Sequence, residues 1–87
     1  MDTGRDKKLL LHFGKVLKRL RKEREWSLRN LAAEAGLEPS YIDKLEKAQS
    51  NPSFLAIILL AEAFDISPIE FFPPDLHPPK ENPTKKR

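Results

Sequence analysis

Few residues of the chain have the types and spacing that catalysis or metal binding requires. His12 and His77 are its only histidines, and it contains no cysteine. Neither histidine is accompanied by a carboxylate cluster, a glycine-rich phosphate loop or a nucleophile–base pair. The two histidines are far too distant in the sequence for the HxxxH spacing of a helical metal site. We therefore expect no enzyme activity, no metal and no cofactor.

Charge is the other polar feature, and it is unevenly distributed. Residues 1–24 carry a balance of +6, residues 25–75 of −6 and residues 76–87 of +3, which together give the net charge of +3. Basic ends suit contact with a nucleic acid, whereas an acidic middle does not. Charge alone therefore leaves the partner open.

The composition also bears on where the protein acts. The absence of cysteine fits a reducing cytosol. The longest apolar run, residues 54–61, is too short for a bilayer, which needs roughly 20 residues. The N-terminus lacks the apolar stretch and cleavage site of a signal peptide. We expect a soluble, cytoplasmic protein with no membrane partner.

Apolar residues recur at helical spacing along most of the sequence, and nothing in it indicates a strand. A first helix is expected at about residues 6–24, where a buried stripe comprises Leu10, Phe13, Val16, Leu17, Leu20 and Arg21. Another helix is expected at about residues 53–64, where the core positions are Phe54, Ile57, Leu60, Ala61 and Phe64. The predicted fold class is all-α.

Between these helices, residues 27–46 predict two short helices joined by a tight turn. The Ser27 hydroxyl can accept a bond from an unsatisfied amide, so Ser27 is placed as an N-cap. Gly36 ends the first short helix, because the residue at that place commonly needs a positive φ. Pro39 opens the second, over about residues 39–47, since its missing N–H costs nothing at the first helical position. The arrangement is a helix-turn-helix.

The sequence changes character after the fourth helix. Ser67, Pro68 and Glu70 predict a fifth helix that opens with a capping box. From Pro73 onward five of fifteen residues are proline, so this segment is expected to be extended or disordered. We divide the chain into an N-terminal extension of the first helix (1–12), a five-helix domain (13–72) and a proline-rich basic tail (73–87).

Taken in order, these residues resemble the Cro/phage-repressor-like helix-turn-helix family of the xenobiotic-response-element type. The matching positions include Phe13-Gly14, Val16, Leu17, Leu20, Arg21, Ser27, Leu31-Ala32, Ala35-Gly36, Tyr41-Ile42, Leu45-Glu46, Asn51-Pro52-Ser53, Leu60-Ala61, Phe64, Ile66 and Ser67. The resemblance implies a five-helix repressor-like domain whose second motif helix enters the major groove of double-stranded DNA. It further implies a sequence-specific transcriptional regulator, expected as a repressor, that acts as a homodimer on an inverted-repeat operator.

The resemblance also implies roles for single residues. The base contacts fall at Pro39, Ser40, Tyr41, Asp43 and Lys44. Lys44 can donate to guanine and Ser40 can bond either way, whereas phosphates repel an unpaired carboxylate such as Asp43. The phosphate contacts fall at Ser27, Leu28, Arg29, Lys47, Gln49, Ser50 and Asn51. Arg21 and Glu46 match the structural ion pair between the first and third helices.

Some positions depart from the family pattern. Leu28 stands where many relatives use glutamine to touch DNA, and Pro39 removes a donor side chain from the first reading position. Ala48 replaces the usual glycine after the third helix, so that turn must either accept strain or take another shape. We therefore expect modest DNA affinity from a monomer, which dimerisation would raise.

A second apolar stripe on the fourth helix, at Leu55 and Leu59, replaces side chains that are usually polar in relatives. Such a stripe must be covered. One candidate cover is a second subunit, and the other is the chain's own ends, including Phe71, Phe72 and Leu76. The stripe also favours an alternative function, namely a protein-interaction module or an antitoxin-like partner-binding protein with weak DNA binding.

Overall fold

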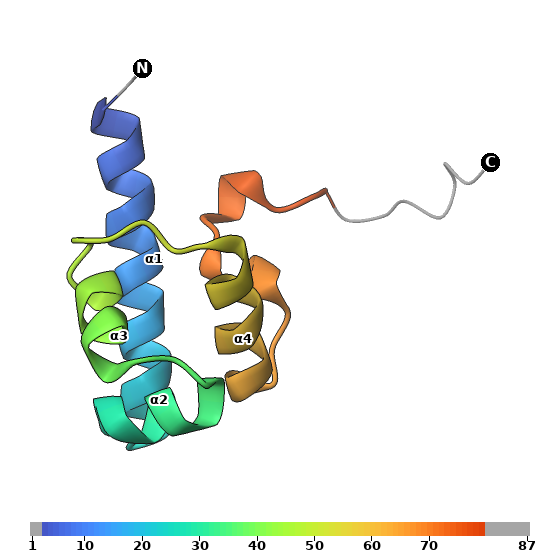
Figure 1. Cartoon of the computed structure of the whole chain (residues 1–87). Helices are drawn as coiled ribbons and strands as arrows, with labels where there is room; N and C mark the ends of the chain where they lie inside the picture. Colours follow the sequence, from blue (N-terminus) through green and yellow to red (C-terminus); the bar gives the residue numbers. More distant parts are fainter. Residues whose placement is uncertain (1–2, 80–87) are drawn as a thin grey trace, which may run out of the picture.

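The computed structural model describes residues 3–79, which form an all-helical fold without strands (Figure 1). The four α-helices are α1 (Thr3–Glu23), α2 (Leu28–Ala35), α3 (Pro39–Glu46) and α4 (Phe54–Phe64). Two short 3-10 helices follow, η1 (Pro68–Phe71) and η2 (Pro74–Leu76). α1 packs against α3 and η1, while α2 packs against α3 and α4. The predicted all-α class is confirmed.

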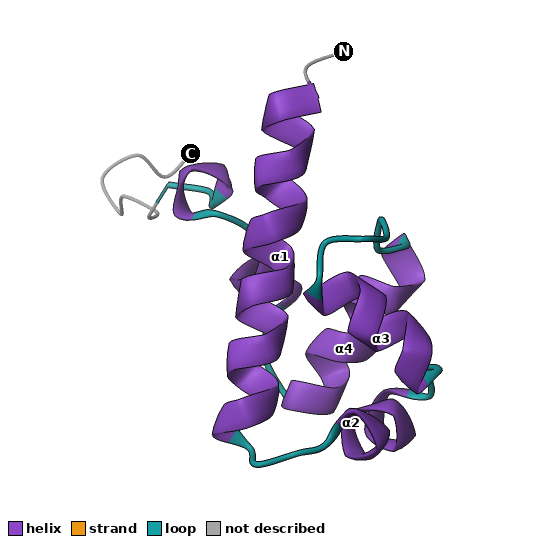
Figure 2. Cartoon of the chain, turned by 90° about the vertical axis from the view of Figure 1, so that its left-hand side faces the viewer, coloured by secondary structure: helices purple, strands orange, loops and turns teal. Residues whose placement is uncertain are grey.

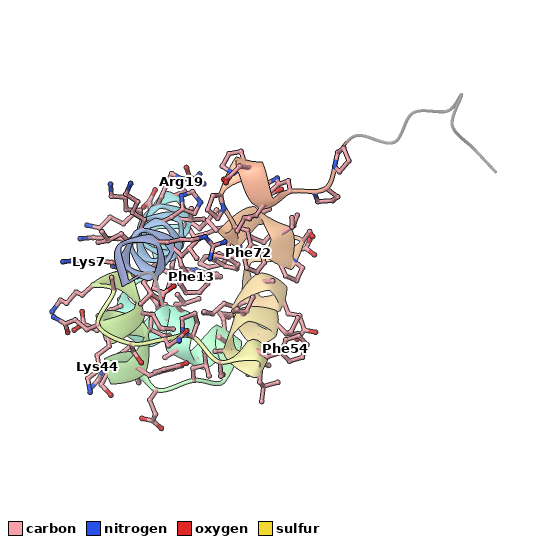
Figure 3. All side chains as sticks on the ribbon, turned by 90° about the horizontal axis from the view of Figure 1, so that it is seen from above. Lys7, Phe13, Arg19, Lys44, Phe54 and Phe72 are labelled. Carbon is pink, nitrogen blue, oxygen red and sulfur yellow. The ribbon has the colours of Figure 1, made fainter. Side chains whose placement is uncertain are left out.

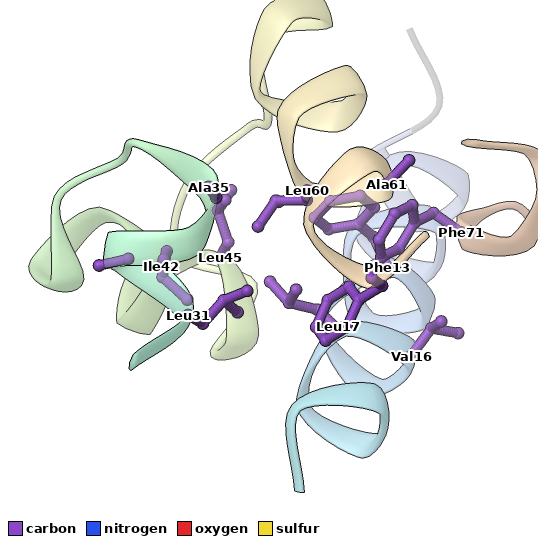
Figure 4. Packing of buried hydrophobic residues seen from close by; sticks show 12 residues of the cluster. Phe13, Val16, Leu17, Leu31, Ala35, Ile42, Leu45, Leu60, Ala61 and Phe71 are labelled. Atoms are coloured by element: carbon purple, nitrogen blue, oxygen red, sulfur yellow. The ribbon is translucent and has the colours of Figure 1, made fainter. Parts of the chain in front are cut away.

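One hydrophobic core holds all these helices except η2 together (Figure 4). Its largest fully buried side chains are Leu17, Leu31, Ile42, Leu45, Leu60, Phe64 and Phe71. Burying each of them contributes roughly 1.5–3 kcal/mol. Trp26, at the corner between α1 and α2, stacks on Phe64 with the ring centroids 5.6 Å apart. The shorter helices α2, α3 and α4, which would be only marginally stable alone, are therefore fixed by a shared core.

α1 and α3 approach each other closely at Gly14, where α1 crosses the last turn of α3. A Cβ atom at this position would lie 2.6 Å from the carbonyl oxygen of Glu46 and 2.7 Å from that of Leu45. Both obstacles are backbone atoms, which cannot rotate aside as a side chain could. Glycine at this position therefore allows α3 to lie directly against α1.

The expected fifth helix is a single 3-10 turn, η1, and not an α-helix. Ser67 caps it, but its Oγ accepts from the amide of Ile69 at 3.3 Å, and the amide of Glu70 bonds to the Ser67 carbonyl at 3.0 Å. The expected capping box with Glu70 is therefore not formed. Phe72 ends the turn in an extended conformation, with φ −99° and ψ 149°. The prolines that follow Phe72 hold it there and lack the amides that a longer helix would need.

The expectation that Phe54 belongs to the core is wrong, because its side chain is 80% exposed. Phe54 is the first residue of α4, directly after the N-cap Ser53, whose Oγ accepts from the amide of Ala56 at 3.0 Å. Helical residues follow at about 100° each, so Phe54 and Ala56 point to nearly opposite sides. Ala56 is the one that faces the core, with 1% exposure.

The two ends of the chain differ in structure. Residues 3–12, expected as an N-terminal extension, continue α1 without a break. The proline-rich segment contains η2, and its residues 80–87 lie outside the described part of the chain. Over residues 3–79, no helix has both the length and the apolar character that crossing a membrane would require.

Candidate nucleic-acid interface

α2 and α3 form a helix-turn-helix with a defined residue at each joint. Ser27 Oγ accepts from the amide of Asn30, and Asn30 Oδ1 accepts from the amide of Ser27, both at 3.0 Å. Gly36 ends α2 in the left-handed conformation with φ 70°, and Pro39 begins α3. The predicted cap, turn and start are thus confirmed. Figure 2 shows α2 and α3 in front of α4 and beside α1.

The exposed side of α3 presents two polar side chains one turn apart. Ser40 and Lys44 are both exposed, and their four-residue spacing places them on the same face. Lys44 points away from the core (Figure 3). Pro39 is half-buried and has neither an N–H nor a polar side chain. Ser40 and Lys44 are therefore the groups of α3 that can bond base edges.

The other two predicted base contacts have partners within the protein. Asp43 Oδ2 lies 3.0 Å from Lys47 Nζ, so its charge is balanced one helical turn away. The hydroxyl of Tyr41 accepts from the amide of Ser53 at 3.1 Å. Tyr41 therefore ties α3 to the start of α4, a link that the sequence did not reveal. The hydroxyl oxygen, through which Tyr41 could bond to a base, thus already accepts one hydrogen bond within the protein.

The start of α2 offers backbone donors. The first four amides of an α-helix have no intrahelical partner. Here the Ser27 amide bonds to Asn30 Oδ1 and the Asn30 amide to Ser27 Oγ. The amides of Leu28 and Arg29 remain, and they point along the helix axis towards any anion placed there. The Arg29 side chain is exposed beside them.

The loop after α3 presents the second group of predicted phosphate contacts. Ala48 has φ 59°, so the turn accepts backbone strain and does not change shape. The Gln49 amide bonds to the Lys44 carbonyl at 2.8 Å and the Ala48 amide to the Leu45 carbonyl at 3.2 Å, which is the Schellman pattern. In this loop Lys47, Gln49 and Asn51 are exposed, and Ser50 is half-buried.

The structure brings together Arg21 and Glu46, on α1 and α3. Nε of Arg21 lies 2.6 Å from Oε2 of Glu46, and Nη2 lies 3.0 Å from Oε1. The two side chains are only 12% and 5% exposed. The hydrogen bond that Arg21 donates to Glu46 raises the pKa of Arg21 above its ordinary value. The guanidinium is therefore a permanent charge that holds α3 against α1 and does not face solvent.

The residues predicted to form a dimer or tail-packing surface separate in space. Phe71 is 1% exposed and packs on Phe13 with the ring centroids 5.0 Å apart, so it is core and cannot serve as a surface. Leu55 is 61% exposed, and Leu59, one helical turn further along α4, is half-buried. The described part of the tail therefore does not cover Leu55.

Phe72 and Leu76 instead line an apolar groove of about 200 Å³, together with Leu9 and Phe13 of α1, Ile57 of α4, and Pro73. The sequence did not predict this groove, because it joins three segments that are far apart in the chain. In the sequence, the apolar residues at positions 9, 57 and 72 could equally be core residues. They therefore do not indicate a groove.

Comparison with known proteins places this geometry in a family. The helix-turn-helix family model matches residues 17–71, which is well over half of the chain. The chain belongs to the helix-turn-helix family. This family consists of DNA-binding transcriptional regulators, so α2 and α3 of this helix-turn-helix protein are a DNA-binding motif.

Solved structures of other helix-turn-helix proteins share the fold. The restriction-modification controller protein C.AhdI from Aeromonas hydrophila is 41% identical, and the match covers 72% of this chain and 96% of that one with a TM-score of 0.70. A transcriptional regulator from Vibrio cholerae is 26% identical over 76% of this chain and 37% of its own, with a TM-score of 0.72. The wild-type restriction-modification controller protein C.Esp1396I is 25% identical over 72% of this chain and 82% of its own, with a TM-score of 0.66. A comparison with curated proteins gave no match.

Proposed function

We propose that this helix-turn-helix protein is a cytoplasmic homodimer that binds an inverted-repeat operator and represses transcription, with no catalytic step. α3 enters the major groove, where Ser40 and Lys44 reach base edges. The observation that carries the proposal is the exposure of these two side chains on one face of a helix that the Arg21–Glu46 pair fixes to α1.

Phosphate contacts on both sides of α3 support the proposal. The amides of Leu28 and Arg29 hold a phosphate at the start of α2. The exposed side chains of Lys47, Gln49 and Asn51 contact the backbone from the loop after α3. Contacts of this kind fix the register of a protein on the duplex but carry no sequence information. Residues 13–72 form the DNA-binding unit.

A titration against DNA upstream of the gene tests the proposal. Binding should weaken with salt, with log K falling against log salt by about 0.9 per phosphate and roughly four to eight phosphates per dimer. Nuclease protection should map the site to an inverted repeat. If no upstream sequence binds at about 50 mM salt, where phosphate contacts are strong, the interaction-module or antitoxin-like function would replace DNA binding.

The likeness to C.AhdI supports a narrower target. That protein is a restriction-modification controller, and its match to this chain extends over almost its whole length. On this proposal the regulated genes are those of a restriction–modification system. Nuclease protection of an inverted repeat upstream of a neighbouring restriction or modification gene is the expected result. Protection only at unrelated genes would remove this target and leave DNA binding intact.

A further inference from the structure

The end of the molecule where α1 begins carries both an apolar hollow and an exposed apolar side chain. α4 starts at this end, and η1 and η2 lie beside it (Figure 1). Figure 3 looks onto this end and shows Phe13 and Phe72 close together between the helices, with Phe54 at the outer side of α4. The apolar groove lies between these helices, and Phe54 is 80% exposed.

The groove has the size and lining that an aromatic ring needs. Its volume is about 200 Å³, and its walls include the rings of Phe13 and Phe72 with the side chains of Leu9, Ile57 and Leu76. An apolar cavity of about 150 Å³ holds a benzene ring. A phenyl ring placed there would leave water for an apolar surface, which is the main driving force of association.

The rest of this chain does not offer a comparable ring. Residues 80–87, which lie outside the described part, have the sequence KENPTKKR and contain no aromatic or branched apolar side chain. Beyond residues 3–79 the only large apolar side chain is that of Met1. A second copy of the chain does carry a ring to insert, because its own Phe54 is exposed.

Phe54 and the groove adjoin each other on one side of α4. Ile57 lines the groove, and Phe54 lies three residues before it, so both project from the same flank of the helix. Leu59 follows Ile57 by two residues and therefore projects from the opposite flank. A twofold axis beside this flank would bring each Phe54 to the groove of the other copy, which is the self-complementary arrangement that a symmetric dimer requires.

From this geometry we infer that this end of the molecule is the homodimer interface and that the Phe54 ring of each copy fills the apolar groove of the other. The inference rests on the proposed homodimeric function and names the surface that performs it. Two inserted rings with their groove walls bury on the order of 600 Å², because an aromatic side chain contributes about 150–250 Å². Leu76, 42% exposed at the groove, enlarges the contact. An area of this order is below the roughly 1,000 Å² of a stable specific interface and therefore indicates a weak dimer that DNA reinforces.

The position of the interface suits operator binding. Asn51 and Pro52 also line the groove, and Asn51 closes the loop predicted to contact phosphates. The interface is therefore continuous with the DNA-facing loop, and the two loops lie beside the twofold axis. In such an arrangement the two α3 helices can enter successive major grooves, about 34 Å apart.

Light scattering of the full chain with paired variants tests the interface. Phe54→Glu should give a folded monomer, because the side chain is exposed and the core is untouched; circular dichroism melts check the fold. Leu76→Arg, at the groove, should also weaken dimerisation, each variant by about tenfold or more. Mixing the two variants should restore dimerisation as a heterodimer. At one contact, the Phe54 ring of the Leu76→Arg copy fills the intact groove of the Phe54→Glu copy. At the other contact, a carboxylate at position 54 pairs with a guanidinium at position 76. Leu59→Glu, on the opposite flank, is the matched control and should dimerise like the wild type.

The outcomes separate the interface from the function. Phe54→Glu that dimerises like the wild type, or a mixture that stays monomeric, overturns the interface. A wild type that is monomeric both free and on operator DNA overturns it as well. Monomeric Phe54→Glu is also compared on an isolated half-site and on the full operator. If it still binds the half-site but has lost cooperativity on the full operator, both the interface and the function are supported. A dimer with these properties that binds no DNA would leave the interface standing and remove the proposed function.

Discussion

Arg21 and Glu46 join α1 to the last turn of α3 through two parallel hydrogen bonds, of 2.6 Å and 3.0 Å. The third bond of the guanidinium runs from Nη1 to the carbonyl oxygen of Trp26, at 2.8 Å, in the corner before α2. One side chain therefore fixes α3 to α1 and to the corner from which the motif starts. The orientation in which α3 presents Ser40 and Lys44 depends on this link.

Arg21→Ala should destabilise the fold far more than it changes sequence preference. Its removal leaves the Glu46 carboxylate, 5% exposed, without its main partner, which typically costs about 3–5 kcal/mol. Thermal melts measure the loss. Arg19→Ala is the control, because Arg19 and Glu23 form an exposed pair at 3.2 Å on the same helix and such pairs contribute about 0–1 kcal/mol. Equal melting temperatures for the two variants would contradict the structural role of Arg21.

Gly14→Ala should also destabilise the protein, because the added methyl group meets two backbone carbonyl oxygens at 2.6 Å and 2.7 Å. Overpacking of this kind costs about 1–3 kcal/mol. Lys15→Ala, at the exposed neighbouring position of α1, should leave stability nearly unchanged. Chemical denaturation compares the two. A Gly14→Ala protein as stable as wild type would show that α1 and α3 are further apart than the structure indicates.

Ala48→Gly should stabilise the protein. Ala48 holds the left-handed conformation, φ 59°, which costs a residue with a Cβ atom about 1–2 kcal/mol and glycine little. Part of this gain is offset by the greater freedom of glycine in the unfolded chain. Ala33→Gly, at an exposed site inside α2, should instead destabilise by about 0.5–1 kcal/mol. Melting temperatures test this prediction, because Ala48→Gly should melt above the wild type and Ala33→Gly below it. Lower melting temperatures for both variants would contradict it.

Lys44 and Lys47 should have different roles on DNA. Lys44→Ala should relax the preference at one base pair per half-site, by about 1–3 kcal/mol, because it removes a donor to a base edge. Lys47→Ala should weaken all sequences alike and lower the salt slope by about 1 per subunit. Selection of binding sites from random DNA with each variant measures both effects. Unchanged base preference in Lys44→Ala would exclude it from base recognition.

Local signals made the helix-turn-helix predictable. The cap at Ser27, the left-handed Gly36 and the opening Pro39 each act within one helical turn, so the sequence contains all the atoms that decide them. Helical spacing and local signals also predicted α1, α3 and α4, with ends within about three residues of those in the structure. The prediction of a fifth α-helix was wrong for a local reason that the sequence also contains. The prolines after Phe72 have no amides with which to extend η1.

The sequence by itself thus determined, within about three residues, where the four α-helices begin and end, and the resemblance it carries assigned Arg21 to Glu46. Only the tertiary structure decided which apolar residues form the core and which form a surface. Phe54, Phe71 and Phe72 have the same side chain, yet Phe54 is exposed, Phe71 is buried against Phe13, and Phe72 lines the groove half-buried. Their burial depends on contacts with residues far away in the chain, and helical periodicity, which relates neighbours three and four apart, does not encode those contacts.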